Sequence, residues 1–356
     1  MVDTLTKITY QTLQQGKSYL SFAHKTLSIQ ARKALKPNNL PGIPVPPELL
    51  VKLQQRVEAL HAVDWQDAEN GIYPTSLLFD EPWVDYLRQY PSLIADMPSI
   101  WARADQKKYQ DFDRDIETEG YPSYYVQNFH HQTGGYLSDL SANLYDLQVE
   151  ILFGGSADSM RRRILAPLKA GLKAFDDVPA KQIRILDAAC GTARTLRGVR
   201  AMLPQASLFG VDLSGAYLRK ANEQLADLPG SLVQLLQGNI EELPYVDNYF
   251  HAVTCVFLFH ELPPSARQNA IEECYRVLKP GGTFIICDSI QVADSPELEA
   301  MMHMFHETFH EPYYRSYMED DTIDRLNKAG FAEVLPTEVH FMSKYLVAKK
   351  SLASPL

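Results

Sequence analysis

The pattern of apolar and polar positions changes near the middle of the chain. From residue 183 onward, amphipathic segments separate most of five short apolar runs: IRILDAA, SLFGVDL, LVQLLQG, AVTCVFLF and TFIICDS. Such alternation is typical of βαβ units, in which helices cover both faces of a parallel sheet. Asp321–Ala329 is helical, and the strand-like runs after it are too close together for a crossover helix. The pattern therefore predicts an α/β fold whose parallel strands end in an antiparallel hairpin.

The first half of the chain has helical periodicity and no clear strand pattern. Pro37–Pro47 is a proline-rich linker that cannot be helical, and a helix is predicted over Glu48–Val63. Helical spacing continues to Phe112. We expect prolines to interrupt it at four positions: Pro74, Pro82, Pro91 and Pro98. The pattern predicts three parts: a basic amphipathic segment at 1–40, a mainly helical cap or substrate region at 41–178, and the sheet domain at 179–356.

Residues 1–40 carry six basic side chains and one acidic side chain. Five apolar residues recur there at helical spacing: Leu20, Ala23, Leu27, Ala31 and Ala34. One interpretation is a basic amphipathic helix that lies on an anionic membrane, which would make the protein a peripheral membrane protein. The other is a solvated arm, or a helix docked on the acidic remainder of its own chain.

Composition narrows the class of protein. The 356 residues are 46% hydrophobic and 22% charged, which suits a large folded core, and the formal net charge of -10 argues against nucleic acid as a partner. The four cysteines form no CxxC pair, and most lie in or beside apolar runs, so we expect reduced thiols and a cytoplasmic location. No apolar run approaches the length of a membrane span.

Polar residues follow the predicted strands at the edge where parallel sheets bind ligands. Asp187 ends the first strand, and its turn leads to a helix whose N-terminus favours a carboxylate or phosphate. Asp212 ends the second strand and can accept both hydroxyls of a ribose. Asn239 follows the third strand, where it could bind the amine of an adenine while Ile240 packs on the ring. His260 and Glu261 follow the fourth strand, where a reacting group would lie.

In order and spacing, these segments resemble class I S-adenosylmethionine-dependent methyltransferases, and the UbiE/COQ5-like group in particular. The resemblance rests on DAACGTA, VDLS, GNIEELPY, HEL and RVLKPGG, and a pre-domain segment at Ser141–Leu165 is also similar. It implies a Rossmann-like sheet of seven strands, parallel but for the C-terminal hairpin, beside an α-helical N-terminal cap. It also implies S-adenosylmethionine as the cofactor and a small-molecule methyl acceptor. The implied cofactor-binding residues are Asp187, Ala189, Cys190, Gly191, Thr192, Arg194, Asp212, Leu213, Asn239, Ile240, Phe257 and Tyr145.

The turn after the first strand contains only Gly191, where a dinucleotide-binding turn requires GxGxxG. A dinucleotide dehydrogenase is therefore excluded. A P-loop protein is excluded as well, because the chain contains no GxxxxGK(S/T) motif. Ala189 occupies a position where the resembling group often has alanine, and Ala193 replaces its last glycine. We expect both alanines to allow close backbone approach at negative φ. Arg194 could compensate by pairing with the methionyl carboxylate, or it could be solvated.

For the chemistry, His260 is the first candidate general base for ionising a phenol-like acceptor, and His131 a second candidate. The alternative for His260 is a residue that only shapes the pocket. His303, His306 and His310 fall on one helical face, where they could form a pocket wall or bind a metal. We expect a methyltransferase for an apolar or aromatic, quinone- or lipid-like acceptor. The alternatives are a water-soluble natural-product O- or N-methyltransferase and a non-catalytic protein that keeps the fold. The oligomeric state is left open.

Overall fold

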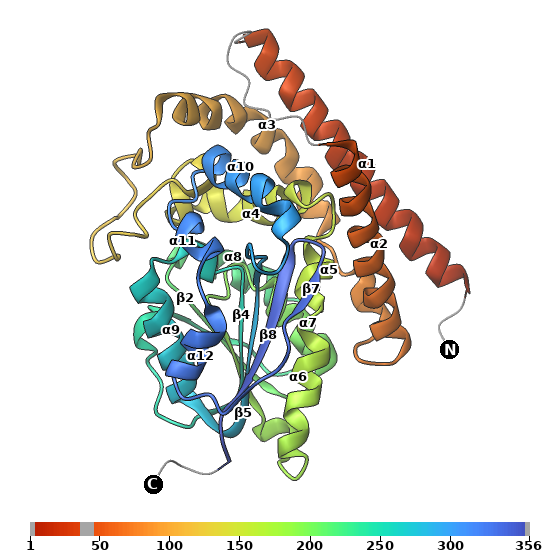
Figure 1. Cartoon of the computed structure of the whole chain (residues 1–356), viewed down its shortest axis with the longest axis vertical. Coiled ribbons are helices and arrows are strands. Elements are labelled where there is room, and N and C mark those ends of the chain that lie inside the picture. The colour runs from red at the N-terminus through yellow and green to blue at the C-terminus, as the bar shows by residue number, and fades with distance from the viewer. Residues whose placement is uncertain (1–3, 36–45, 353–356) are drawn as a thin grey trace. The chain divides into compact units, whose positions relative to one another are not determined.

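The computed structural model describes residues 4–35 and 46–352, and it divides the chain into two compact units (Figure 1). The first unit comprises residues 1–160 and 300–310, and the second comprises residues 161–299 and 311–356. Most of the proline-rich segment Pro37–Pro47 lies outside the described residues.

The first unit is helical. Its helices are α1 (Thr4–Leu35), α2 (Pro47–Glu69), α3 (Trp83–Gln106), α4 (Asp139–Leu152), most of α5 (Ala157–Arg162) and nearly all of α10 (Glu299–Phe309). Its apolar core joins α3 to α4 through Tyr86, Leu93, Leu144, Leu147 and Ile151. The predicted helical first half is confirmed, since the described residues before 160 contain helices and no strand.

Two of the four expected proline breaks are wrong. Pro74 and Pro82 precede helical segments as expected, but Pro91 and Pro98 lie inside α3, which continues through both. Both prolines are exposed, so the carbonyl groups that lose a helical hydrogen bond can face water. Burial of Leu93 and Met97 on the opposite face holds the helix together.

Helix α1 packs with a different face from the one that its sequence indicated. Its buried residues are Tyr10, Gln14, Lys17 and Ser21, while Leu20 and Leu27 are 49% and 62% exposed. The helix is fastened to α3 by an ion pair from Arg32 to Asp105 at 2.7 Å, and it also packs against α4. Helix α1 therefore packs within its own unit, and contact of its exposed apolar residues with a membrane stays a prediction.

The second unit is a twisted sheet in the order β3-β2-β1-β4-β5-β8-β6, with β7 also paired to β8. The strands are β1 (Arg184–Ala188), β2 (Ser207–Asp212), β3 (Gln234–Gln237), β4 (Phe250–Val256), β5 (Leu278–Ser289), β6 (Glu333–Val334), β7 (Glu338–His340) and β8 (Ser343–Lys349). β1 to β5 are parallel, and the last three strands are antiparallel. The predicted architecture is confirmed. β6 and β7 pair successive parts of β8, so they are one predicted strand divided near Pro336.

Helices flank this sheet on both sides (Figure 1). They are α6 (Leu165–Gly171), α7 (Arg194–Met202), α8 (Gly215–Leu225), α9 (Pro264–Val277), α11 (Tyr314–Met318) and α12 (Thr322–Lys328). α6 contacts both β5 and α7, so residues after 160 pack with the sheet. For this reason the unit begins before the expected boundary at 178/179. The segment 300–310 belongs instead to the helical unit.

Candidate cofactor and acceptor site

The turn between β1 and α7 bends sharply at three left-handed residues. The φ angles are 58° at Ala189, 53° at Gly191 and 68° at Ala193. The expectation that both alanines would adopt negative φ is therefore wrong. An L-residue in this region costs about 1 kcal/mol, because its Cβ approaches the carbonyl oxygen. Ala193 is fully buried and is the N-cap of α7, so the surrounding structure holds it in this conformation.

Asp187 lies at the buried end of β1. Thr254 of β4 donates its hydroxyl to the Asp187 carboxylate at 2.7 Å. Burial raises the pKa of Asp187 to about 7, helped by the nearby Asp212 carboxylate and opposed by the Thr254 hydrogen bond. Only 1% of Asp187 is exposed. A direct contact between Asp187 and the cofactor stays a prediction.

Asp212 at the end of β2 holds the same turn from the side. One carboxylate oxygen accepts the backbone N–H of Gly191 at 2.8 Å, and the other accepts that of Ser214 at 2.8 Å. Desolvation raises the pKa of Asp212 to about 6, although these amide hydrogen bonds oppose the shift. The backbone N–H of Leu213 makes a third interaction with this carboxylate, so one lone-pair site remains, and the side chain is only partly buried. That site can accept a hydroxyl of a ribose, and a contact of Asp212 with both ribose hydroxyls of S-adenosylmethionine stays a prediction.

The remaining residues of the predicted turn have different surroundings. Cys190 and Thr192 are buried, and burial raises the pKa of the Cys190 thiol well above its usual range. The thiol is therefore protonated at neutral pH. Arg194 and Leu213 are partly exposed. Contacts of these four residues with a cofactor stay predictions.

Asn239 begins the loop after β3. Its side-chain oxygen accepts the N–H of Glu241 at 3.0 Å and caps the short helix η6 (Ile240–Glu242), while Ile240 is buried. The oxygen keeps one lone pair for an adenine amine. Arg276, which is not among the residues expected at this site, supports the loop by donating to the carbonyl groups of Leu243 and Tyr245. Its position in RVLKPGG was the available signal.

Phe257, directly after β4, has a φ of 58° and donates its N–H to the Cys287 carbonyl at 2.8 Å. The guanidinium of Arg161 lies 5.6 Å from the centre of the Phe257 ring. Arg161 and the two arginines that follow it, Arg162 and Arg163, are buried. A planar guanidinium stacks on an aromatic face more readily than an ammonium does.

His260 lies in the short helix η7 (Phe259–Glu261) after β4. Its Nδ1 is 2.6 Å from a carboxylate oxygen of Asp288 on β5. Burial lowers the pKa of His260, but the carboxylates of Asp288, Glu311 and Glu261 outweigh that effect and raise it to about 9. The imidazole is therefore largely protonated at neutral pH. As a base it becomes more available as the pH rises.

Two predicted residues belong to the first unit. The ring of Tyr145 contacts that of Tyr136 edge-on at 6.1 Å, and His131 is buried, with its carbonyl group accepting a bond from Arg103. Burial is the main cause that lowers the pKa of His131. Their roles beside the second unit's residues stay predictions.

The three histidines at the end of α10 do not share one helical face. The helix ends at Phe309, and His310 has a φ of 48°. Its ring stacks on Tyr109 at 3.9 Å, and its Nε2 is 3.1 Å from the Gln127 side-chain oxygen. Among the described residues, no group of side chains suited to a metal includes His303, His306 or His310.

The sheet domain is similar in sequence to known methyltransferases. Residues 185–282 match the family described as a methyltransferase domain. The demethylmenaquinone methyltransferase of Symbiobacterium thermophilum is 32% identical over 155 residues, which are 43% of this chain and 57% of the relative. The ubiquinone/menaquinone biosynthesis C-methyltransferase UbiE of Methylobacterium nodulans is 29% identical over 159 residues, 44% of this chain and 59% of the relative.

The chain thus spans somewhat over half the length of these relatives, and the matches cover less than half of this chain. The matched family segment runs from β1 through the turn and Asp212 to the start of β5. This part of the chain is similar to methyltransferase domains of the class I type, including members of the UbiE-like group.

Proposed function

We propose that the protein transfers a methyl group from S-adenosylmethionine to a small apolar or aromatic acceptor. The observation that carries this proposal is the Asp212 carboxylate, braced by the amides of Gly191 and Ser214 beside a left-handed turn. Asp212 would accept hydrogen bonds from the ribose hydroxyls and Asn239 from the adenine amine, while the N-terminal amides of α7 would donate to the methionyl carboxylate. The similarity to quinone C-methyltransferases supports a quinone- or lipid-like acceptor.

The bound sulfonium supplies an activated methyl group. In the transfer the acceptor atom would bond to that carbon while the carbon–sulfur bond broke with its electron pair going to sulfur, and the acceptor's proton would have to leave. Neutral His260 would take that proton at Nε2, with Asp288 holding the opposite nitrogen. Alignment of the two reactants alone can contribute about 7–11 kcal/mol to lowering the barrier.

Calorimetric titration of the protein with S-adenosylmethionine and its demethylated product tests cofactor binding. Asp212→Asn keeps the shape of the side chain but loses its charge, and we expect at least about a tenfold loss of affinity. Asp324→Asn is the matched control, because Asp324 is an exposed carboxylate that pairs with Lys328 on α12. Wild-type protein that binds neither compound at submillimolar concentration would support the non-catalytic alternative.

The acceptor is tested by incubating the protein with labelled S-adenosylmethionine and reduced demethylmenaquinone, followed by mass analysis of the product. A methylated quinol supports the proposal. Methylation of water-soluble phenols or amines from a cell extract, without reaction of the quinol, would support the natural-product alternative instead.

We also infer that α1 contacts an anionic membrane. Leu20, Phe22 and Leu27 are 49%, 70% and 62% exposed, while Lys33 supplies positive charge in the last turn of the same helix. No helix in the described part of the chain is long and apolar enough to cross a bilayer. Flotation with phosphatidylglycerol vesicles should capture the protein, and Phe22→Glu with Leu27→Glu should release it. Equal flotation of both proteins would contradict this contact.

A reducing compartment, as in the cytoplasm, fits the cysteines. All four are free and buried, at positions 190, 255, 274 and 287. Burial raises the pKa of the thiol groups of Cys190 and Cys255 well above the usual range, which makes them poor nucleophiles.

A further inference from the structure

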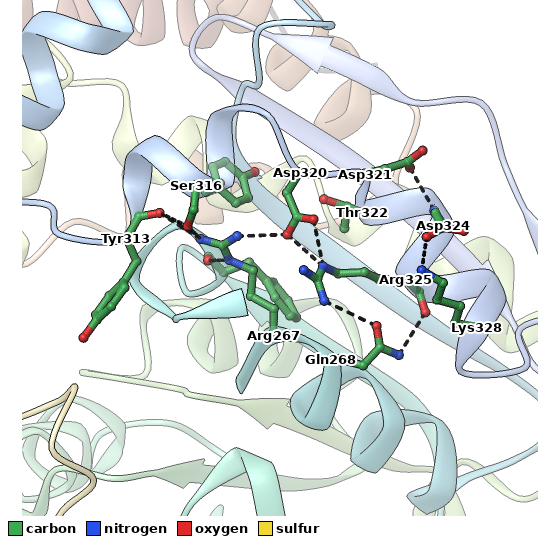
Figure 2. A network of polar contacts seen from close by, with 12 residues as sticks. Arg267, Gln268, Tyr313, Ser316, Asp320, Asp321, Thr322, Asp324, Arg325 and Lys328 are labelled. Carbon is green, nitrogen blue, oxygen red and sulfur yellow. Dashed lines mark hydrogen bonds and ion pairs between the residues drawn. The ribbon is translucent and has the colours of Figure 1, made fainter. Parts of the chain in front are cut away.

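A buried arginine on α9 joins several segments of the second unit (Figure 2). Arg267 is 1% exposed. Its Nε donates to the carbonyl oxygen of Phe259 at 2.9 Å, and its Nη1 donates to Asp320 at 2.9 Å. Its Nη2 donates to the carbonyl oxygen of Tyr313 at 2.8 Å and to the Ser316 hydroxyl at 2.9 Å. One guanidinium therefore fixes η7, the start of α11 and the segment before α12.

These segments carry the groups that surround His260. η7 contains His260 itself, and α11 contains Tyr314 and Tyr317, whose ring centres lie 6.0 and 6.2 Å from the imidazole. Arg267 also lies 5.5 Å from the centre of the Tyr317 ring. The position of the His260 imidazole between η7 and α11 thus depends on Arg267. The contacts of Arg267 described above are with the segments around His260 and not with the imidazole itself.

Asp288 also holds the start of η7, through hydrogen bonds that Arg267 does not make. One of its oxygens accepts the N–H groups of Leu258 and Phe259, while the other bonds the imidazole. The Phe259 peptide region is therefore held through its N–H by Asp288 and through its carbonyl by Arg267. The two interactions lock the backbone from which His260 extends.

We propose that Arg267 is a positioning residue for His260, holding its imidazole against Tyr314 and Tyr317 where the acceptor's proton is removed. The proton-removal role rests on the proposed function, but the positioning role does not. Proton removal by His260 implies an acceptor with an ionisable hydroxyl group. The methylated atom is then either the oxygen of that hydroxyl group or a carbon conjugated to it. The ionisable groups that face His260 in this unit are Asp288 of β5, Glu261 of η7, Glu311 before α11, and Tyr314 and Tyr317 of α11.

Arg267→Lys tests the proposal against a matched control, Arg325→Lys. Arg325 lies on α12 and also bonds Asp320, at 2.8 Å, but its other side-chain hydrogen bond goes to Gln268 of α9 rather than to η7 or α11. Both variants keep the positive charge and lose a guanidinium bond to Asp320. Only Arg267→Lys also loses the bonds that fix η7 to α11.

The measurement is the titration of the His260 imidazole by NMR with labelled histidine, assigned by comparison with His260→Gln. In the wild type and in Arg325→Lys we expect the imidazole to titrate well above the ordinary histidine value. In Arg267→Lys we expect the midpoint to fall by about one pH unit, a tenfold change in proton affinity, as the ring moves from Asp288. Equal titration of His260 in the two variants would overturn the proposal.

A milder variant keeps the test valid if Arg267→Lys does not fold. Ser316→Ala removes one bond between Arg267 and α11 and should shift the titration in the same direction by a smaller amount. An unshifted midpoint in this variant, with Arg267→Lys unfolded, would also overturn the proposal.

Cofactor affinity separates this proposal from the proposed function. Titration with S-adenosylmethionine should give affinities within about twofold of the wild type for Arg267→Lys, since Asp212 and Gly191 are untouched. With reduced demethylmenaquinone as the probe, kcat should fall at least tenfold, with a smaller change in the cofactor KM. A wild type that binds no cofactor would refute the proposed function, while the His260 titration would still decide whether Arg267 positions the imidazole.

Discussion

The backbone N–H of Gly191 donates to the carboxylate of Asp212 at 2.8 Å. This bond joins the turn after β1 to the end of β2, so the residue expected to hold the ribose also maintains the shape of the turn. A change at Asp212 therefore affects both the ligand contact and the backbone around it. Cofactor binding and turn conformation are expected to vary together.

The affinity for S-adenosylmethionine should fall as the pH decreases through about 6. The pKa of Asp212 in the free protein is raised to about 6, mainly by desolvation, and ribose hydroxyls bind the ionised form better. Protonation below that pH therefore competes with binding. Calorimetry between pH 5 and pH 8 measures this dependence, and an affinity independent of pH over that range would contradict the role of the carboxylate.

Replacing Ala193 with glycine should stabilise the protein by about 0.5–1 kcal/mol. The φ of 68° is unfavourable for alanine and accessible to glycine, although the greater freedom of unfolded glycine offsets part of the gain. Urea denaturation measures the change. Ala193→Val should destabilise the protein, because a β-branched side chain fits this conformation still less well. A stability loss in Ala193→Gly would show that the turn carries little strain.

The sequence was sufficient to place the strand ends. Parallel strands bring Asp187 and Asp212 to one edge, and this relationship follows from the order of apolar runs and turns alone. The conformations of Ala189 and Ala193 could not be predicted, because alanine ordinarily avoids positive φ and only the packed surroundings impose it. The hydrogen bonds of Arg267 could not be predicted either, because Tyr313 and Asp320 lie 46 and 53 residues after it in the chain.

The buried face of α1 could not be predicted from helical periodicity. Helical periodicity assigns apolar residues to the interior, but Lys17 is 4% exposed and pairs with Glu81 at 2.5 Å. Only the tertiary fold brings Glu81 and Glu150 to this lysine. Leu20 and Leu27 are exposed on the same helix.

Gly210→Ala and Gly16→Ala should have opposite effects on stability. A Cβ at Gly210 would lie 2.7 Å from Leu235 and 2.8 Å from the Cys190 sulfur, whereas a Cβ at Gly16 would meet nothing within 4 Å. Overpacking in the sheet should cost about 1–3 kcal/mol, while alanine inside α1 should contribute about 0.5–1 kcal/mol. Chemical denaturation of both variants measures the pair, and similar changes in stability would contradict this difference in packing.

Replacing Lys17 with methionine should destabilise the first unit by about 3–5 kcal/mol, because it leaves buried carboxylates without their cation. Burial lowers the pKa of Lys17, but Glu150 and Glu81 outweigh it and raise the pKa, so the lysine is charged. Burial also raises the pKa of Glu81 to about 7, against the attraction of Lys17.

Without Lys17, Glu81 should take up a proton more readily, so the loss of stability should diminish as the pH falls from 8 to 5. Glu81→Gln combined with Lys17→Met should recover part of the stability, since the double variant buries one carboxylate fewer. Thermal denaturation of both variants across this pH range measures the coupling. If the single variant lost the same stability at every pH, the charge cluster would not determine the packing of α1, and the shape of the lysine side chain alone would explain its burial.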